Sequence, residues 1–282
     1  MSSALAQPEP SSRERPALVN GVPQAVVSVH DRGLQYGDGL FETLRCEQGR
    51  ARWFERHLAR LGAGCARLHI PRPDGELLRR EAESLLEGCP RALVKLVLTR
   101  GVATRRGYRP AGDEQATRIL TVHPWPAAGR PEFRVGLSPV PLGCNPLLAG
   151  LKHLNRLEQV LAQQAAAASG VDEVLMCSPG GQVISGSMSN LFVVQDGALV
   201  TPSLEQGGVA GIMRSLVLDL APQLGIAVSV QALSRQDLEA APALFVTNVR
   251  LGVQAVHWYE GRRLHPDACG LRLQELIDRA EA

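Results

Sequence analysis

A proline-rich stretch, 124-PWPAAGRPE-132, divides this chain of 282 residues into two parts that each mix short apolar runs with helical patterns. Prolines, alanines and a glycine between strand-like runs are typical of a semi-rigid linker. The sequence therefore predicts an α/β protein of the α+β kind with two domains, a smaller one over 17–123 and a larger one over 133–282. Residues 1–16, rich in Ser, Pro, Glu and Arg, are expected to form a disordered tail.

Apolar periodicity in the first part predicts strands and helices in alternation. The run 39-GLFETLRCEQGR-50 is strand-like, and the apolar residues of 54–70 recur every three or four positions, as on one face of a helix. A second helical stretch, 75–87, leads into two β-branched apolar runs, 92–101 and 117–123, which are expected to be neighbouring strands. This part is therefore expected to be an α+β unit.

The second part predicts two helices among strands. Helical spacing places apolar residues on one face over 152–168, with Lys152 at the N-terminal edge, and again over 209–225. Five short apolar runs are strand candidates: 133–139, 172–178, 181–185, 190–197 and 243–248.

Composition excludes several function classes. The 30 Lys and Arg residues against 28 Asp and Glu give a net charge of +2, too small for a dedicated nucleic-acid binder. No run reaches the ~18–20 apolar residues of a membrane span, and the first fifteen residues lack an apolar signal segment, so a soluble, cytoplasmic protein is expected. Six widely spaced cysteines form no C-x-x-C pair, so no metal site is expected.

Lysine is rare in this chain, since only Lys95 and Lys152 occur among the 30 basic residues. Because arginine can supply positive charge, a remaining lysine is a candidate for amine chemistry. At a helix start, the dipole would lower the pKa of Lys152, and a neutral amine is both a nucleophile and a proton base. A surface lysine with its stem on apolar residues is the alternative. Lys95 lies in a strand, where pairing with a carboxylate is the simpler account.

Four sequence motifs occur in order: 30-HDRGLQYGDGLFETLR-45, 57-HLARL-61, 190-NLF-192 and 211-GIMR-214. Together they resemble the class IV aminotransferase-like enzymes, the fold type IV group that uses pyridoxal 5'-phosphate. Within this group, 137-LSPVPLGCNPLLAGLKHLNRLEQVLA-162 is similar to the aminodeoxychorismate lyases. The resemblance implies a two-domain subunit with the cofactor held between the domains, and a homodimer. The implied reaction converts 4-amino-4-deoxychorismate to 4-aminobenzoate and pyruvate, in folate biosynthesis.

The resemblance also implies roles for individual residues. Lys152 would bond covalently to the cofactor and serve as the catalytic base, and Arg60 would bind the cofactor phosphate through a charge-assisted contact. The backbone N–H groups of Gly211, Ile212 and Met213 would form an anion site at a helix start.

Further candidates are expected near the phosphate and the substrate. Thr247 and Asn248 match the family's segment there, although a turn after a strand explains both equally well. Tyr108, Arg156 and again Asn248 are candidates for binding the substrate carboxylates, with surface placement of Tyr108 and Arg156 as the alternative.

One residue departs from the family's pattern. Many members carry a glutamate before the S-N-L-F run, where it pairs with the protonated pyridine nitrogen, but in 183-VISGSMSNLF-192 its place is taken by Ser185. A hydroxyl supports the protonated ring only weakly, so transamination is expected to suffer most. Aromatisation drives the lyase reaction, so the sequence favours a lyase. Two alternatives stay open: an aminotransferase acting on branched-chain or D-amino acids, and a catalytically silent cofactor-binding protein.

Overall fold

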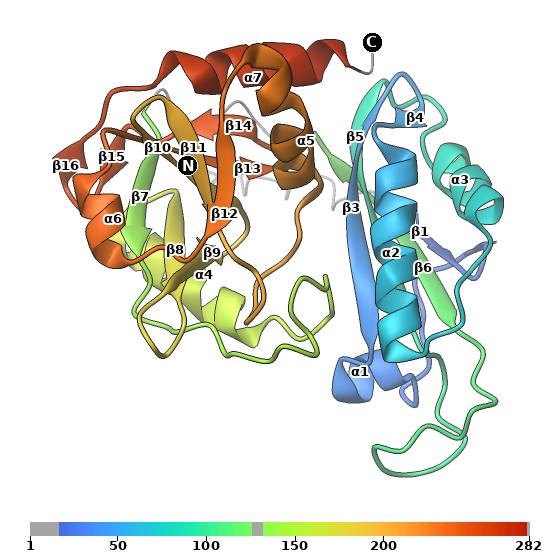
Figure 1. Cartoon of the computed structure of the whole chain (residues 1–282). Coiled ribbons are helices and arrows are strands. Elements are labelled where there is room, and N and C mark those ends of the chain that lie inside the picture. Colours follow the sequence, from blue (N-terminus) through green and yellow to red (C-terminus); the bar gives the residue numbers. More distant parts are fainter. Residues whose placement is uncertain (1–16, 126–131, 281–282) are drawn as a thin grey trace, which may run out of the picture.

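The computed structural model describes residues 17–125 and 132–280, which form two bodies (Figure 1). The N-terminal body contains one six-stranded sheet in the order β2-β1-β6-β5-β3-β4. Its strands are β1 (Ala17–Val19), β2 (Val22–Pro23), β3 (Gly39–Glu47), β4 (Arg50–Ala51), β5 (Arg91–Thr99) and β6 (Thr117–Pro124), and its helices are α1 (Arg32–Tyr36), α2 (Phe54–Leu68) and α3 (Gly75–Ser84). β5 and β6 are neighbours, as the sequence predicts, and the structure shows that they run antiparallel.

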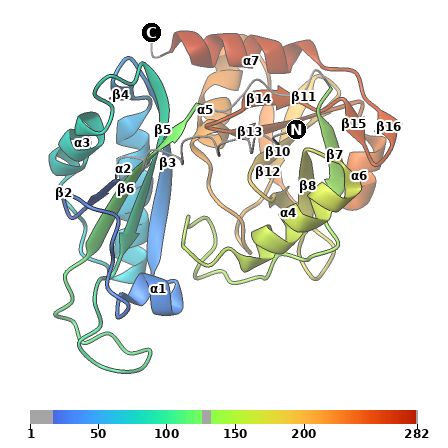
Figure 2. The ribbon, with the colours of Figure 1, turned by 180° about the vertical axis from the view of Figure 1, so that it is seen from behind.

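The C-terminal body contains two five-stranded sheets, in the orders β12-β11-β10-β13-β14 and β16-β15-β7-β8-β9. Its strands are β7 (Arg134–Leu137), β8 (Glu173–Cys177), β9 (Val183–Gly186), β10 (Asn190–Gln195), β11 (Ala198–Pro202), β12 (Val228–Gln231), β13 (Ala243–Asn248), β14 (Gly252–Ala255), β15 (Trp258–Tyr259) and β16 (Arg262–Arg263). Its helices are α4 (Leu157–Ser169), α5 (Ile212–Leu220), α6 (Arg235–Ala240) and α7 (Ala268–Arg279), with a 3-10 turn η1 (Ala221–Leu224) after α5. Figure 2, seen from behind, shows the end of α7 reaching toward the N-terminal body.

Packing of α2 on β3 builds the core of the N-terminal body. Leu58 and Leu61 of α2 are buried against Leu40 and Leu44 of β3, as the apolar spacing of both segments requires. Because side chains alternate along a strand, Glu42 faces the same side as these two leucines. The fold therefore places a carboxylate beneath α2.

Arginines along α2 connect it to the C-terminal body. Arg56 donates to Asp219 Oδ2 at 2.7 Å, Arg60 to the carbonyl of Ala210 at 2.8 Å, and Arg67 to the carbonyl of Ala149 at 2.8 Å. Trp53, just before α2, is buried in a core cluster of the C-terminal body. The two bodies therefore meet along this helix.

The helix predicted over 152–168 is wrong at its beginning, because α4 begins only at Leu157. The segment before it is held by β3, since Phe41 N–H donates to the Lys152 carbonyl at 2.9 Å and Leu154 N–H to the Gly39 carbonyl at 3.0 Å. Tertiary hydrogen bonding thus overrides the helical pattern here.

Two expectations about the chain's organisation are not decided by the structure. Residues 1–16 and most of the expected linker 124–132, namely 126–131, lie outside the described residues. The division into domains at 124–132 therefore stays a prediction. No helix within 17–125 and 132–280 is long and apolar enough to cross a membrane.

Candidate active site

Lys152 lies where the two bodies meet. The chain enters this position through Gly150, whose φ of +81° is a left-handed conformation that glycine adopts without strain. Gly150 also forms backbone hydrogen bonds with Gly208 and Ala210. On the other side, Nζ of Lys152 lies 4.1 Å from the ring centroid of Phe41. The segment that carries Lys152 is thus held between β3 of one body and the loop before α5 of the other.

The pKa of Lys152 is lowered to about 7. Burial is the main cause, and the positive charge of Arg60 is the next, while Glu42 acts in the opposite direction. The expected direction is confirmed, but the expected cause, a helix dipole, is wrong because Lys152 precedes α4 by several residues. The amine is therefore largely neutral above neutral pH.

Lys95 does not pair with a carboxylate among the described residues, contrary to expectation. It is exposed on β5, and its Nζ lies 5.5 Å from the ring centroid of Phe41. Both lysines of the chain therefore flank one aromatic ring.

Arg60 projects from α2 to Glu42. Its Nε donates to Glu42 Oε1 at 2.8 Å, and its Nη2 donates to Oε2 of the same carboxylate. Nη1 donates to the carbonyl of Ala210. Three of the five guanidinium N–H groups are thus used, which leaves two for a further acceptor such as a phosphate.

Glu42 is also bound by His57, whose Nδ1 lies 2.7 Å from Glu42 Oε2. Both side chains are buried, with 2% and 1% of their surface exposed. Burial alone would raise the pKa of Glu42, but Arg60 and His57 hold it at about 2. Burial lowers the pKa of His57, so the ring is neutral and donates its Nδ1 proton to the carboxylate.

The start of α5 offers an anion site. Gly211 is the N-cap, and its backbone lies so close to Asn190 that a Cβ would collide with Asn190 Oδ1. The first N–H groups of a helix, here those of Ile212 and Met213, have no partner within the helix. Opposite Asn190, Thr247 is 1% exposed and its Oγ1 has no hydrogen-bond partner among the described residues. A buried hydroxyl without a partner is costly, so this cradle fits a phosphate group.

Ser185 is buried in β9, and its Oγ donates to the carbonyl of Gly186 at 2.9 Å. The loop that follows is held by Glu173, which accepts from Ser187 N–H at 3.1 Å and from Ser189 Oγ at 2.8 Å. Glu173 is the one carboxylate buried in the described part of the C-terminal body. Since its oxygens are already saturated by donors, it does not replace the family's glutamate at position 185.

Arg156 lies beside Lys152. Its guanidinium carbon is 5.9 Å from the Phe41 ring centroid, so Arg156 and Lys152 lie at the same ring. Its Nε and Nη2 donate to the carbonyls of His153 and Leu151 at 2.9 and 3.1 Å, which leaves three N–H groups. Burial lowers the pKa of Arg156 to about 10, so the group stays charged at neutral pH. The structure thus brings Arg156 next to Lys152.

Asn248 and Tyr108 are placed differently. Asn248 Oδ1 accepts from the N–H groups of Arg250 and Leu251 at 2.9 and 2.8 Å, which is the turn after a strand. Tyr108 is 84% exposed, and its ring packs on Tyr36 with centroids 5.3 Å apart. A substrate contact of either residue stays a prediction.

Sequence reasoning did not single out Glu42, His57 or Glu173. The available signal was a carboxylate at an inward position of an apolar strand, as Glu42 stands two residues from Leu40 and from Leu44. A carboxylate is rarely buried unless it is paired, so such a position predicts a partner on another element.

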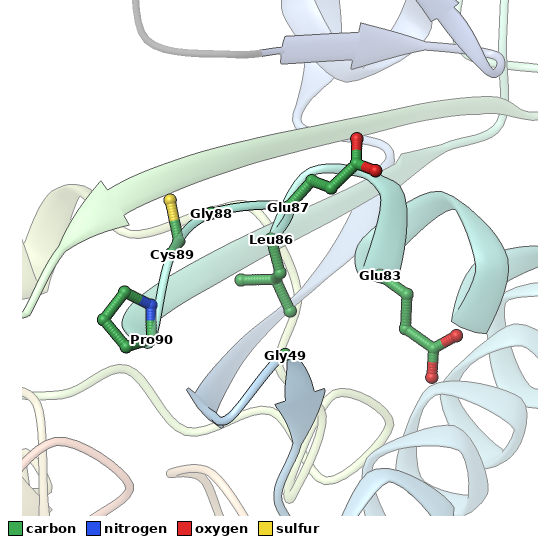
Figure 3. A pocket seen from close by; sticks show the side chains of 7 residues that line it. All are labelled: Gly49, Glu83, Leu86, Glu87, Gly88, Cys89 and Pro90. Atoms are coloured by element: carbon green, nitrogen blue, oxygen red, sulfur yellow. The ribbon is translucent and has the colours of Figure 1, made fainter.

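A surface hollow of about 500 Å³ lies away from these residues, on the N-terminal body (Figure 3). Its lining residues are Gly49, Glu83, Leu86, Glu87, Gly88, Cys89 and Pro90. The carboxylates of Glu83 and Glu87 extend away from each other in Figure 3, so they do not form a paired ligand set.

A lysine whose pKa is lowered to about 7, near a helix start that can bind an anion and at the junction of two α+β bodies, is typical of enzymes that use a phosphorylated carbonyl cofactor. A family model described as amino-transferase class IV matches residues 39–259, and the chain belongs to this family.

Relatives with both lyase and aminotransferase names match the chain. The aminodeoxychorismate lyase of Vibrio harveyi is 35% identical, over 84% of this chain and 89% of its own. The crystal structure of 4-amino-4-deoxychorismate lyase from Pseudomonas aeruginosa is 40% identical, covers 93% of this chain and 98% of its own, and has a TM-score of 0.88. A Methanocaldococcus jannaschii protein, provisionally named a branched-chain-amino-acid aminotransferase, is 34% identical over 87% of each chain.

The residues around Lys152 fit pyridoxal phosphate, the cofactor of this family. A crystal structure of the T.th. branched-chain amino acid aminotransferase with pyridoxamine 5'-phosphate is 26% identical, with a TM-score of 0.84 and coverage of 94% of this chain and 93% of its own. In this chain, Lys152 would bind the carbonyl carbon, while Thr247, the start of α5 and the free N–H groups of Arg60 would bind the phosphate.

Proposed function

We propose that this chain is a pyridoxal-phosphate-dependent lyase that converts 4-amino-4-deoxychorismate to 4-aminobenzoate and pyruvate, and so supplies a precursor of folate. The observation that carries the proposal is Lys152, a half-buried lysine whose amine has a pKa of about 7, beside an anion cradle with an unpartnered hydroxyl. The lyase names of relatives at 35% and 40% identity support this reaction.

When bound, pyridoxal phosphate bonds to a substrate amine and withdraws electrons from the adjacent carbon. In this proposal Lys152 Nζ takes the proton from C4 of the substrate, since a neutral amine with a pKa near the working pH is an efficient base. The bond between the ring and the enolpyruvyl oxygen breaks, and enolpyruvate leaves with the electron pair as the ring becomes aromatic. The proton then held by Lys152 can be given to enolpyruvate, which becomes pyruvate.

Ser185 favours the lyase over an aminotransferase. An aminotransferase needs a strong electron sink to stabilise a carbanion, which a carboxylate at the pyridine nitrogen supports. Ser185 offers a neutral hydroxyl, and the nearby carboxylate of Glu173 is saturated by other donors. Elimination that yields an aromatic ring makes a smaller demand on the cofactor.

Arg156 supports a substrate that carries carboxylates. 4-Amino-4-deoxychorismate has two, and Arg156 is a charged guanidinium beside Lys152 with three N–H groups left for acceptors. We assign Arg156 to one of these carboxylates. An Arg156→Lys variant, which loses the planar fork, is expected to raise KM for the substrate more than it lowers kcat.

The deciding experiment is incubation of the purified holoenzyme with 4-amino-4-deoxychorismate. Formation of 4-aminobenzoate and pyruvate in equal amounts is expected, and Lys152→Ala should abolish it. Reduction with borohydride should fix the cofactor on Lys152, as peptide mapping would show. A label on Lys95 with none on Lys152, or rapid transamination of leucine or D-alanine with no lyase activity, would contradict the proposal.

We also propose that the protein is a cytoplasmic homodimer. Large apolar side chains are exposed on both bodies, among them Val26, Val29 and Leu34 on one and Leu157 and Leu161 on the other. All six cysteines are free thiols, which fits a reducing compartment. Light scattering on the purified protein would test the dimer, and cell fractionation the location.

A further inference from the structure

Glu42 of β3 and His57 of α2 form a buried pair that the proposed reaction leaves without a role. We propose that Glu42 is a positioning residue: it pairs with Arg60 and supplies the negative charge that offsets the charge of this guanidinium beside the Lys152 amine. His57 fixes the carboxylate in place. This inference rests on the proposed function, in which Lys152 must both accept a proton and release it.

The pairing with Arg60 is geometric. The side-on pair of guanidinium N–H groups, on Nε and Nη2, is taken by the two oxygens of Glu42. Nη1 is anchored on the Ala210 carbonyl, directly before the N-cap of α5. Arg60 is therefore held by both bodies, and the carboxylate offsets its positive charge beside the lysine.

Charged groups act on the Lys152 amine from several elements. Among those with the strongest effect, Glu42 alone is negative, and the positive groups are Arg60 on α2, Arg156 just before α4 and Lys95 on β5. The neutral ring of His57 also lies close enough for its own pKa to be lowered by Lys152. Burial and three cations all favour the neutral amine, so without Glu42 the lysine would lose its proton at lower pH.

Arg60 connects Glu42 to the backbone that carries the lysine. Arg60 donates to the Ala210 carbonyl, and the Ala210 N–H donates to the carbonyl of Gly150, two residues before Lys152. His57 then supplies a further donor to Glu42, so the carboxylate is ionised although it is buried. A base whose proton affinity matches the working pH can take a proton in one step and return it in the next.

The test measures the pH dependence of Lys152 reactivity in the cofactor-free, full-length protein. Pyridoxal is the probe, because it lacks the phosphate and so avoids contacts of Arg60 with a phosphate. The adduct is trapped with borohydride and quantified on the Lys152 peptide. In Glu42→Gln, the midpoint of the labelling profile is expected to fall by about one pH unit, a roughly tenfold change in the amine equilibrium. Glu42→Asp, which keeps the charge, should return the midpoint toward that of the wild type.

Glu81→Gln is the matched control. Glu81 is also buried in the N-terminal body and is bound side-on by an arginine, Arg118, at 3.2 and 2.8 Å. This variant is expected to titrate like the wild type. A Glu42→Gln profile with the wild-type midpoint would overturn the role of Glu42 and leave the proposed function standing, whereas a wild type unlabelled at Lys152 would overturn the proposed function itself.

A second comparison serves if Glu42→Gln alone does not fold. The double variant Glu42→Gln with Arg60→Gln buries no net charge at the pair, and it is compared with Arg60→Gln. The double variant is expected to titrate about one pH unit below the single one. Equal midpoints would refute the proposal.

Discussion

Replacing Arg60 by alanine tests the centre of the site, because this side chain connects Glu42, the α5 start and the expected phosphate. The variant removes two bonds to the Glu42 carboxylate and one to the Ala210 carbonyl. Glu42 would stay buried with His57 as its remaining partner. Both the stability of the protein and its affinity for the cofactor are therefore expected to fall.

The stability loss follows from the buried carboxylate. Burial raises the pKa of Glu42, but its partners outweigh this effect and lower the pKa from 4.5 to about 2. This shift corresponds to roughly 3 kcal/mol of folding stability at 1.36 kcal/mol per pH unit. Breaking a buried ion pair by removing one partner costs about 3–5 kcal/mol, so the two magnitudes agree. A carboxylate whose pKa is lowered by folding stabilises the fold at pH values above its pKa in the unfolded chain. The difference in unfolding free energy between wild type and variant is therefore largest above pH 4.5 and narrows as the pH falls toward 2.

Arg118→Ala separates this loss from cofactor binding. It unpairs the buried Glu81 in the same body, so a loss of unfolding free energy is expected, with unchanged affinity for pyridoxal phosphate. Arg60→Ala should in addition weaken cofactor binding by about tenfold or more, since a charge-assisted contact contributes roughly 1.5–3 kcal/mol. Urea unfolding and a cofactor titration of the apoproteins measure the two effects. Equal cofactor affinity in the two variants would refute the phosphate role of Arg60.

Three further outcomes are expected. Thr247→Val removes a buried hydroxyl that has no partner, so urea unfolding of the cofactor-free protein should show an unfolding free energy that is unchanged or raised by about 1 kcal/mol. A cofactor titration should show weaker binding than in the wild type. Equal cofactor affinity in the two proteins would remove Thr247 from the phosphate site. Between pH 7 and 10.5 the unfolded chain binds more protons at Lys152 than the folded chain does, so the unfolding free energy of the cofactor-free protein should rise with pH in that window. Lys152→Met should remove this rise. An identical pH slope in both proteins would contradict the lowered pKa of Lys152. Ser185→Glu should raise transamination between amino acids and 2-oxoglutarate without improving elimination, and a coupled assay that finds no gain would argue against the electron-sink account.

Local patterns in the sequence determined many of the longer elements and the central residue. Period-two and period-3.6 spacing predicted β3, β5, β6 and α2, because burial of one face depends on neighbours along the chain. The scarcity of lysine singled out Lys152, and the four ordered motifs indicated the family that the comparisons show. Ser185 was recognised by its place within one motif.

The tertiary structure decided what surrounds the lysine. Hydrogen bonds from β3 keep Lys152 out of α4, so burial and neighbouring charges, rather than a helix dipole, lower its pKa. The Glu42 pair with Arg60 joins positions 18 residues apart on a strand and a helix, and the Arg60 contact with Ala210 spans 150 residues. Such contacts depend on how elements pack in space, and a periodic pattern along the chain records only which face is buried, not which group lies opposite it.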